Sequence, residues 1–144
     1  MIAIGCDHGG YELKKELMAF LDENNYEYKD FGCDGEAVDY PDIAKKVCAE
    51  IVEKRADKGI LICGTGIGIS MAANKIKGIR AALCADYFSA KYTRLHNDSN
   101  VICFGGRTMG AGTAKESLSV FLTTEFEGGR HAVRVDKMMK LENE

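Results

Sequence analysis

Short apolar runs alternate along the chain with longer segments in which apolar residues recur every three or four positions. The apolar runs predict β-strands, and the amphipathic segments predict helices. The predicted strands cover residues 2–6, 26–31, 59–63, 79–84 and 100–104. The predicted helices cover residues 11–22, 42–53, 68–76, 86–94 and 111–122, with a charged helical end at 136–143. In the second helix the face expected to be buried holds Ile43, Val47, Ile51 and Val52.

Apolar strands separated by helices are typical of a parallel sheet that carries helices on both faces. Because crossovers between parallel strands are right-handed, the sequence predicts a doubly wound α/β fold with five strands. No linker, low-complexity segment or internal repeat interrupts the pattern, so residues 1–144 are expected to form one domain. The only proline, Pro41, falls where a helix is expected to begin, a position that tolerates it.

Sites in such sheets form beyond the carboxyl ends of the strands. Four polar or glycine-rich segments are expected at these ends, and together they hold most of the reactive side chains of the chain. They are residues 6–8, 63–65, 96–98 and 105–107.

Composition and charge exclude several classes of protein. The chain is 46% hydrophobic and 28% charged, and its net charge of −3 makes a nucleic-acid or anionic-membrane partner unexpected. No apolar run approaches the roughly 18 residues of a membrane helix. The first residues lack the basic start and long apolar stretch of a signal peptide, so a cytoplasmic protein is expected.

The chain has six cysteines, which are Cys6, Cys33, Cys48, Cys63, Cys84 and Cys103. No two of them form a CxxC pair, so the spacing of a zinc ribbon is absent. Without a secretion signal, free thiols in a reducing compartment are expected rather than a disulfide framework. Most of these cysteines should be small buried hydrophobes, which leaves one or two as candidates for chemistry.

The segment CGTGIGIS, residues 63–70, follows one predicted strand and precedes a helix. Its glycines allow backbone amides to approach an anion, and the helix adds the positive end of its dipole. A Walker A loop would need a lysine, and a dinucleotide fingerprint would be GxGxxG after the first strand. A cysteine-based phosphatase loop would need an arginine late in the loop, where Ile67 and Ile69 stand. The remaining interpretations are an amide nest that faces the thiol of Cys63, or a buried strand-end cysteine without a function.

A thiol facing such a nest suits the isomerisation of an aldose to a ketose. This reaction removes a carbon-bound proton next to a carbonyl, and negative charge then develops on the sugar oxygens as an enediolate forms. Aimed amides stabilise that charge by about 3–4 kcal/mol per well-placed donor in other systems. A helix N-terminus can lower the pKa of a thiol toward the range of a general base.

Other candidates have two interpretations each. Asp7 and His8 could bind sugar hydroxyls or shuttle protons, or they could be a helix cap and an exposed histidine. Arg130 and Arg134 are four residues apart and, with Arg107, could hold a phosphate or form a solvated basic face. The histidines lack HExxH-like spacing, so no metal site is expected.

Several ordered motifs span nearly the whole chain and resemble one known family. They are CDHGG near the start, DYPD at 39–42, GILICGTGIGISMAANK at 59–75, GIRAAL at 78–83, HNDSNV at 96–101 and EGGRH at 127–131. The sequence is similar in these motifs to ribose-5-phosphate isomerase B, in a group that also contains galactose-6-phosphate and allose-6-phosphate isomerases.

The resemblance implies a Rossmann-like α/β/α sandwich without a metal or an organic cofactor. It implies interconversion of D-ribose 5-phosphate and D-ribulose 5-phosphate, a step of the pentose phosphate pathway. Cys63 matches the family's proton-abstracting base, and His96 matches the acid partner that opens the sugar ring together with Thr65. The positions that match substrate contacts are Asp7, His8, Tyr40, Gly64, Thr65, Gly66, Ile67, Gly68, Asn97, Arg107, Arg130 and Arg134.

The resemblance further implies a homodimer that can pair into a tetramer, with each site shared between subunits. In the family, the His96 loop and the C-terminal arginines meet the partner's Cys63 loop, and the C-terminal helix is expected to pack on the partner. Because this one chain carries the full set of residues, a self-sufficient homo-oligomer is expected.

Two alternatives remain from the sequence. One keeps the mechanism but acts on a six-carbon sugar phosphate, since the depth of the pocket is not visible in the motifs. The other is a sugar-phosphate sensor that uses the nest and the arginines without a thiol base. A receiver-type signalling domain is disfavoured because the third strand ends in Cys63 and not in an aspartate.

Overall fold

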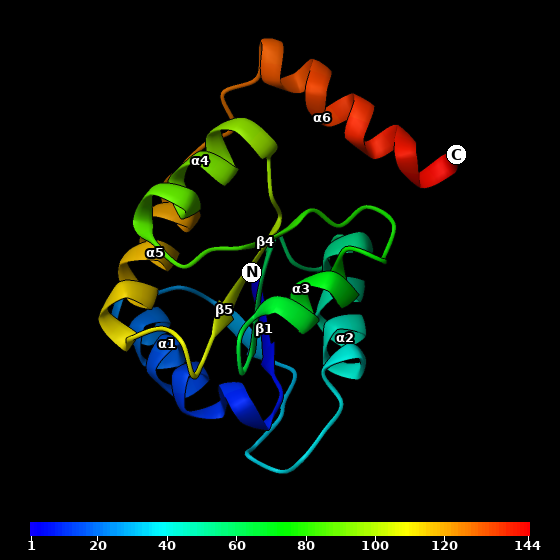
Figure 1. The fold of residues 1–144 in the computed structure, drawn as a ribbon. Helices are drawn as coiled ribbons and strands as arrows, with labels where there is room; N and C mark the ends of the chain where they lie inside the picture. Colours follow the sequence, from blue (N-terminus) through cyan, green and yellow to red (C-terminus); the bar gives the residue numbers. More distant parts are fainter.

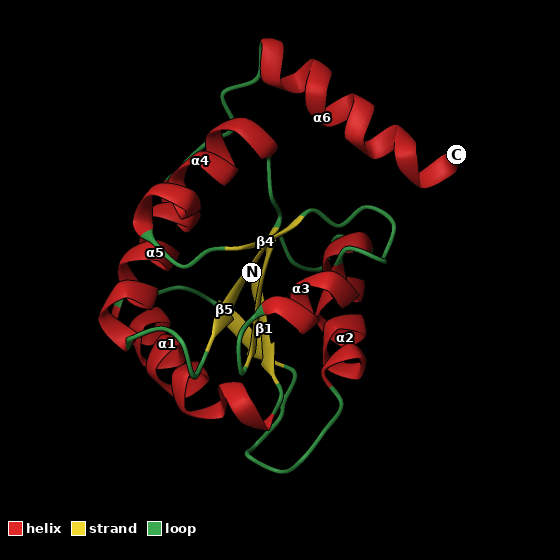
Figure 2. Cartoon of the chain, in the orientation of Figure 1, coloured by secondary structure: helices red, strands yellow, loops and turns green.

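The computed structural model describes all residues from 1 to 144, which form one sheet covered by helices on both faces (Figures 1 and 2). The strands are all parallel and lie in the order β2-β1-β3-β5-β4. They are β1 (Ile2–Cys6), β2 (Tyr28–Asp30), β3 (Lys58–Cys63), β4 (Ala81–Leu83) and β5 (Val101–Gly105). Each overlaps a predicted strand, so the doubly wound five-stranded α/β fold is confirmed.

The helices form two layers, one on each face of the sheet (Figure 1). On one face lie α2 (Tyr40–Val52) and α3 (Ile67–Ala73), and on the other lie α1 (Tyr11–Glu23), α4 (Tyr87–Asn97) and α5 (Ala111–Thr123). The last helix, α6 (Arg130–Lys140), projects beyond the sheet and packs on α4 (Figure 1). Short 3-10 helices, His8–Gly10 and Leu141–Asn143, precede α1 and follow α6.

Strand β3 shows how the core is divided between the two layers. Ile60 and Ile62 pack in the apolar cluster with α1 and α5, whereas Leu61 and Cys63 pack in the cluster with α2 and α3. This alternation follows from the two-residue period of a strand, and both faces are apolar because helices cover both. Cys63 therefore ends its strand on the side of α2 and α3.

The centre of the sheet is a topological switch point between β1 and β3. After β1 the chain continues to β2 on one side, and β3 then pairs with the opposite side of β1. Ligands in open α/β sheets bind in the crevice beyond the carboxyl ends of such strands. The segments that follow Cys6 and Cys63 lie at this position.

Several helix boundaries differ from the prediction, and two of these differences change the position of candidate site residues. Helix α4 continues to Asn97 instead of ending near residue 94, so His96 lies in its last turn. Asp98 ends the helix in the left-handed conformation (φ 49°), and its carboxylate accepts a hydrogen bond from Arg94 at 2.9 Å. This local cap and ion pair add stability that the apolar periodicity does not encode.

The other difference is that α6 already begins at Arg130, well before the predicted helical end at 136–143. Gly128 and Gly129, which precede it, both have positive φ values of 71° and 58°. Glycine adopts these values without steric cost, so the chain can turn sharply between α5 and α6.

One side chain that the sequence predicts as buried is exposed, and one lysine is buried. Val52 is 46% exposed and faces the groove between α2 and α3 instead of the core. Lys14 is fully buried, and its ammonium donates to Asp30 at 2.8 Å and to the carbonyl of Cys33 at 2.5 Å. An ammonium group tolerates burial when it gains an ionic partner and hydrogen bonds, as it does here.

None of the helices has both the length and the apolar character needed to cross a lipid bilayer.

Candidate active site

The carboxyl ends of β1 and β3 lie side by side, which brings Asp7 next to the loop after Cys63. Cys6 pairs with Ile62 in the register, and the N–H of Asp7 donates to the carbonyl of Ile62 at 3.1 Å. The buried Asp7 carboxylate accepts the N–H of Gly9 at 2.9 Å and caps the first 3-10 turn, whereas His8 is exposed. Asp7 thus has the capping role considered from the sequence, with its second carboxylate oxygen still available to a ligand.

The glycine loop after β3 folds around the thiol of Cys63. The N–H of Gly66 donates to Cys63 Sγ at 3.2 Å, and the N–H of Ile67 donates to Thr65 Oγ1 at 3.2 Å. Two amides of the predicted nest therefore already donate hydrogen bonds to side chains of the same loop and are not free to bind a ligand. The sulfur of Cys63 thus accepts a backbone hydrogen bond from its own loop.

Gly66 is required by the geometry of this loop. Its φ is +78°, in the left-handed region, and it precedes α3. A Cβ at this position would lie 2.5 Å from Leu83 Cδ1 and 2.8 Å from the carbonyl carbon of Phe104. Only glycine therefore lets the chain turn from β3 into α3 while keeping its amide on the sulfur.

The loop after β5 adds Arg107 to the same edge. The N–H of Gly106 donates to the carbonyl of Cys63 at 2.8 Å, and the N–H of Arg107 donates to the carbonyl of Gly64 at 2.9 Å. The Arg107 guanidinium lies over Gly64, where a Cβ would be 3.4 Å from Nη1. This places a permanent positive charge beside the glycine loop.

Tyr40 reaches the glycine loop from the start of α2. A Cβ on Gly68 would lie 2.8 Å from Cζ of the tyrosine ring, so the ring rests directly on Gly68. Pro41 occupies the first turn of α2, as expected for a helix start. Of the predicted site residues, one edge of the sheet thus brings together Asp7, His8, Tyr40, Cys63, Gly64, Thr65, Gly66, Ile67, Gly68 and Arg107.

Burial distinguishes Cys63 from most of the other thiols. All six cysteines are free and buried, as the sequence predicts, and Cys63 is the least buried at 5% exposure. Burial raises the pKa of Cys6, Cys48 and Cys84 to about 12, and it raises the pKa of Cys103 as well. These four thiols are therefore protonated at neutral pH and unsuited to act as bases.

The remaining predicted residues lie at the opposite edge of the sheet. Helix α4 runs back from β4, so His96 and Asn97 arrive beside the amino ends of the strands. The carbonyl of the nearby Asn100 accepts the N–H of Gly59 at 2.9 Å, at the beginning of β3. The expectation that residues 96–98 form a carboxyl-end loop was wrong, because they precede β5 and do not follow a strand.

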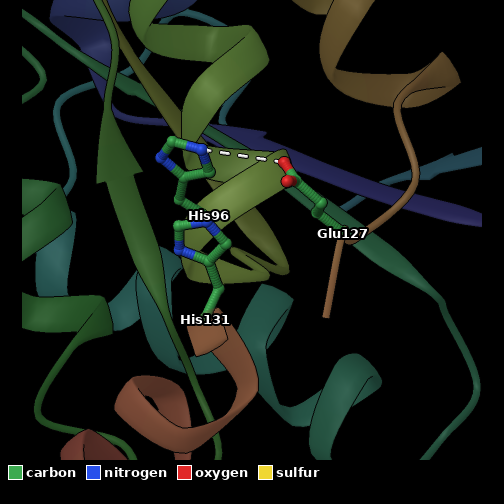
Figure 3. Close-up of side chains that lie close together, drawn as sticks. All are labelled: His96, Glu127 and His131. Carbon is green, nitrogen blue, oxygen red and sulfur yellow. Dashed lines mark ion pairs between the residues drawn. The ribbon is translucent and has the colours of Figure 1, made fainter. Parts of the chain in front are cut away.

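At the amino ends of the strands, the imidazole rings of His96 and His131 are stacked, and Glu127 lies beside them (Figure 3). The rings of His96 and His131 have centroids 3.9 Å apart and planes inclined by 10°, and His96 Nε2 lies 3.8 Å from Glu127 Oε2. His131 is only 6% exposed, and its Nε2 has no hydrogen-bond partner. Desolvation lowers the pKa of His131, and the neighbouring His96 and Arg130 lower it further, so His131 is neutral at pH 7.

Arg130 and Arg134 extend from the first turns of α6 into solvent. No ion pair holds either guanidinium, so both are available to an anion. Their four-residue separation places them on one face of the helix, as the sequence predicts.

A cavity of about 610 Å³ separates α6 from residues 74–82 and is lined in part by Asn97. The 3-10 turn after α6 is anchored by Glu142, whose carboxylate accepts the N–H of Gly78 at 2.9 Å. Val135 in the middle of α6 is also buried, and Arg80 donates to Met139 Sδ at 3.6 Å, so the helix is held at several points.

One chain therefore presents two separate groups of candidate residues. The strands between them are five or six residues long, which corresponds to roughly 17–20 Å. Cys63 and His96 of the same chain cannot contact one small sugar phosphate across that distance.

Glu127 and the pairing of His131 with His96 were missed by the sequence analysis. Glu127 and His131 lie in the EGGRH motif, but only its arginine, Arg130, was selected as a site residue. Two features bring Glu127 and His131 to His96. One is the turn at Gly128 and Gly129, and the other is the N–H of Glu127, which donates to the carbonyl of Leu95 at 3.1 Å.

Comparison with known proteins adds independent evidence. A family model described as Ribose/Galactose Isomerase matches residues 2–138. The chain is 51% identical to a Bacillus subtilis protein named as a sugar phosphate isomerase (98% of this chain, 96% of the relative). It is 46% identical to ribose-5-phosphate isomerase B of Escherichia coli (98% and 95%). The solved structure of ribose-5-phosphate isomerase B from Clostridium thermocellum superimposes with a TM-score of 0.96 at 48% identity (99% and 97%).

Proposed function

The chain belongs to the ribose/galactose isomerase family, and we propose that it interconverts D-ribose 5-phosphate and D-ribulose 5-phosphate through an enediolate. The observation that carries this proposal is the thiol of Cys63 under the amide of Gly66, with the Arg107 guanidinium beside it. Near-full-length similarity to ribose-5-phosphate isomerases supports the five-carbon substrate over a six-carbon one.

In this proposal Cys63 is the general base. Its thiolate removes the proton from carbon 2 of the open-chain aldose, and the bonding electrons form the double bond of the enediolate. Returning a proton to carbon 1, with transfer of the hydroxyl proton from oxygen 2 to oxygen 1, yields the ketose. The role of Cys63 is supported by its hydrogen bond from Gly66 and by the raised pKa values of four other thiols.

The glycine loop stabilises the charge that develops on the sugar oxygens. The loop amides other than those of Gly66 and Ile67 face the sugar oxygens in this proposal, and each well-placed amide contributes about 3–4 kcal/mol in comparable sites. His8 and Tyr40 bind the sugar from the two sides of this loop, and Arg107 adds a positive charge to it. This assignment is supported by the contacts of Tyr40 with Gly68 and of Arg107 with Gly64.

His96 and Asn97 complete the site from a second subunit. His96 and Thr65 assist opening of the sugar ring, Asn97 binds a hydroxyl, and Arg130 and Arg134 hold the phosphate. A C2 homodimer provides two such shared sites, because each chain gives its Cys63 edge to one and its His96 edge to the other. The separation of the two groups within one chain supports this arrangement.

Exposed apolar side chains around the glycine loop support the same dimer. Ile67 and Met71 of α3 are 51% and 62% exposed, and Phe88 at the start of α4 is 68% exposed. Large apolar side chains left in solvent are of the kind that a protein interface covers. In this dimer α6, with Val133 exposed on its surface, packs on the partner, and two dimers can pair into a tetramer.

A cytoplasmic location accompanies this function. Six reduced cysteines, four with raised pKa values, fit a reducing compartment, where thiols remain free.

Solvent exchange provides the test of the proposed function. Incubation with D-ribose 5-phosphate in D₂O should form D-ribulose 5-phosphate that carries deuterium at carbon 1. Relative kcat/KM values for the phosphates of ribose, allose and galactose then define the substrate. Binding of ribose 5-phosphate without exchange or product would indicate a sensor and overturn the proposal.

A further inference from the structure

Three potential metal ligands converge at the amino edge of the sheet from three different segments. His96 lies in the last turn of α4, Glu127 in the connection after α5, and His131 in the first turn of α6 (Figure 3). One ligand atom from each of them lies within 4.8 Å of the other two. Their order in the sequence does not suggest a site, since none of the usual zinc motifs is present.

The Nε2 atom of His131 is an unexplained feature of this cluster. The side chain is 6% exposed, yet this nitrogen has no hydrogen-bond partner. A buried polar atom without a partner costs about 1–3 kcal/mol, so native structures nearly always provide one. The only other buried side-chain atom in this condition is the hydroxyl of Ser117. A cation placed between the rings and the Glu127 carboxylate would satisfy the nitrogen of His131.

We infer that His96, Glu127 and His131 form a binding site for a divalent transition-metal ion such as Zn²⁺. Two imidazoles and one carboxylate are a common zinc ligand set, with a fourth position left to water. Ligands at about 2.1 Å from a tetrahedral ion lie about 3.4 Å apart, close to the 3.8 Å between His96 Nε2 and Glu127 Oε2. The rings must open from their stack, a rotation for which the broad χ2 preference of histidine leaves room.

The ligand set also determines which ions are excluded. Mg²⁺ and Ca²⁺ prefer six or more oxygen ligands, and the cluster offers a single carboxylate. Arg130 and Arg134 add positive charge nearby but are exposed, so solvent and salt screen them. Zn²⁺ should therefore bind selectively, though less tightly than at a structural Cys₄ site.

Occupancy of this site has a consequence that rests on the proposed function. An ion bound to Nε2 of His96 occupies the nitrogen that would otherwise carry the proton donated in ring opening. Zn²⁺ should therefore inhibit the isomerase, with the inhibition reversed by a chelator. Binding itself does not depend on the reaction, so the two can be measured separately.

Calorimetric titration of the full-length chain with Zn²⁺, in the presence of a thiol-free reductant, tests binding directly. One ion per chain is expected, and Glu127→Gln and His131→Gln should each weaken binding about tenfold or more, since even indirect ligand partners contribute about 10–100-fold. Glu125→Gln removes a neighbouring exposed carboxylate outside the cluster and should bind as tightly as the unchanged chain.

Titration with Co²⁺ separates this site from metal capture by cysteine. The bound ion should lack thiolate-to-cobalt charge-transfer absorption, and its spectrum should persist in Cys63→Ala. In the activity assay Zn²⁺ should inhibit the unchanged enzyme and Glu125→Gln, but spare Glu127→Gln. Absence of binding, equal binding by Glu127→Gln, or a thiolate spectrum would each overturn the site. An inactive chain that binds Zn²⁺ as described would contradict only the proposed function.

Discussion

The imidazole ring of His131 lies face to face on that of His96, and this contact joins two helices that are separated in the sequence. The ring of Tyr92 also contacts His96, edge-on, with ring centroids 5.1 Å apart. His96 therefore packs against two rings. The orientation of His96 is thus set by α6 as well as by its own helix. Any displacement of α6 changes the surroundings of the proposed acid.

Replacement of Cys63 by alanine should reduce kcat by roughly 10²- to 10⁴-fold, because general-base catalysis contributes about that factor. Binding of ribose 5-phosphate, measured by calorimetry, should change little. Cys48→Ala is the matched control, since it removes a thiol from the same apolar cluster without touching the glycine loop. Full activity of Cys63→Ala would contradict its assignment as the base.

Mixing two inactive variants should restore activity if the site is shared between subunits. Cys63→Ala and His96→Gln are each expected to be inactive as homodimers. After unfolding and refolding together, half of the dimers contain one of each chain, and one of their two sites is intact. Isomerase activity should then approach about a quarter of the unchanged level. If no activity returns while mixed dimers are demonstrated by mass spectrometry, the site is not shared in this way.

Gly66→Ala should destabilise the fold and reduce activity together. The added Cβ would meet Leu83 at 2.5 Å in a left-handed backbone conformation, which costs about 1 kcal/mol before any overlap is counted. Urea unfolding should therefore show a loss of about 2 kcal/mol or more. Gly112→Ala, in open space near the start of α5, should be neutral or stabilising by up to about 1 kcal/mol. Equal stability of the two variants would argue against the described loop.

Iodoacetamide at pH 8 should alkylate Cys63 in preference to Cys6, Cys48 and Cys84. A thiol with a pKa of about 12 is deprotonated to only about one part in 10⁴ at pH 8. As the pH rises toward 12 the thiolate fraction of these buried cysteines increases, so selectivity should fall with pH. Peptide mass spectrometry across this range provides the measurement, and early labelling of Cys48 would be inconsistent with its burial.

The buried ion pair of Lys14 and Asp30 should respond unequally to removal of its two partners. Asp30→Ala leaves an ammonium in the core with only the carbonyl of Cys33, a change that costs up to about 3–5 kcal/mol in comparable cases. Lys14→Met replaces the buried charge by an apolar chain of similar length and should cost less. Urea unfolding compares them, and a larger loss for Lys14→Met would reverse the argument.

The sequence by itself determined the fold, because the two-residue and 3.6-residue periods of β3 and α2 are local properties of the chain. It also identified the glycine loop, since Cys63 and the residues up to Gly68 are consecutive and their geometry follows from one strand-to-helix turn. Local pattern was insufficient for Val52, which is exposed to the groove beside α3, and it did not reveal that Lys14 is buried against Asp30.

Only the tertiary structure decided which distant residues meet. The strand-end pattern placed His96 at the same edge as Cys63, whereas the family resemblance implied contact with the partner's Cys63 loop. In the chain itself α4 carries His96 to the opposite edge of the sheet, where it stacks on His131 and approaches Glu127. These contacts depend on where whole helices end in space, which is set by packing against the sheet and by the turn at Gly128 and Gly129. Spacing along the chain contains no record of such encounters, so the candidate metal cluster became visible only in the folded protein.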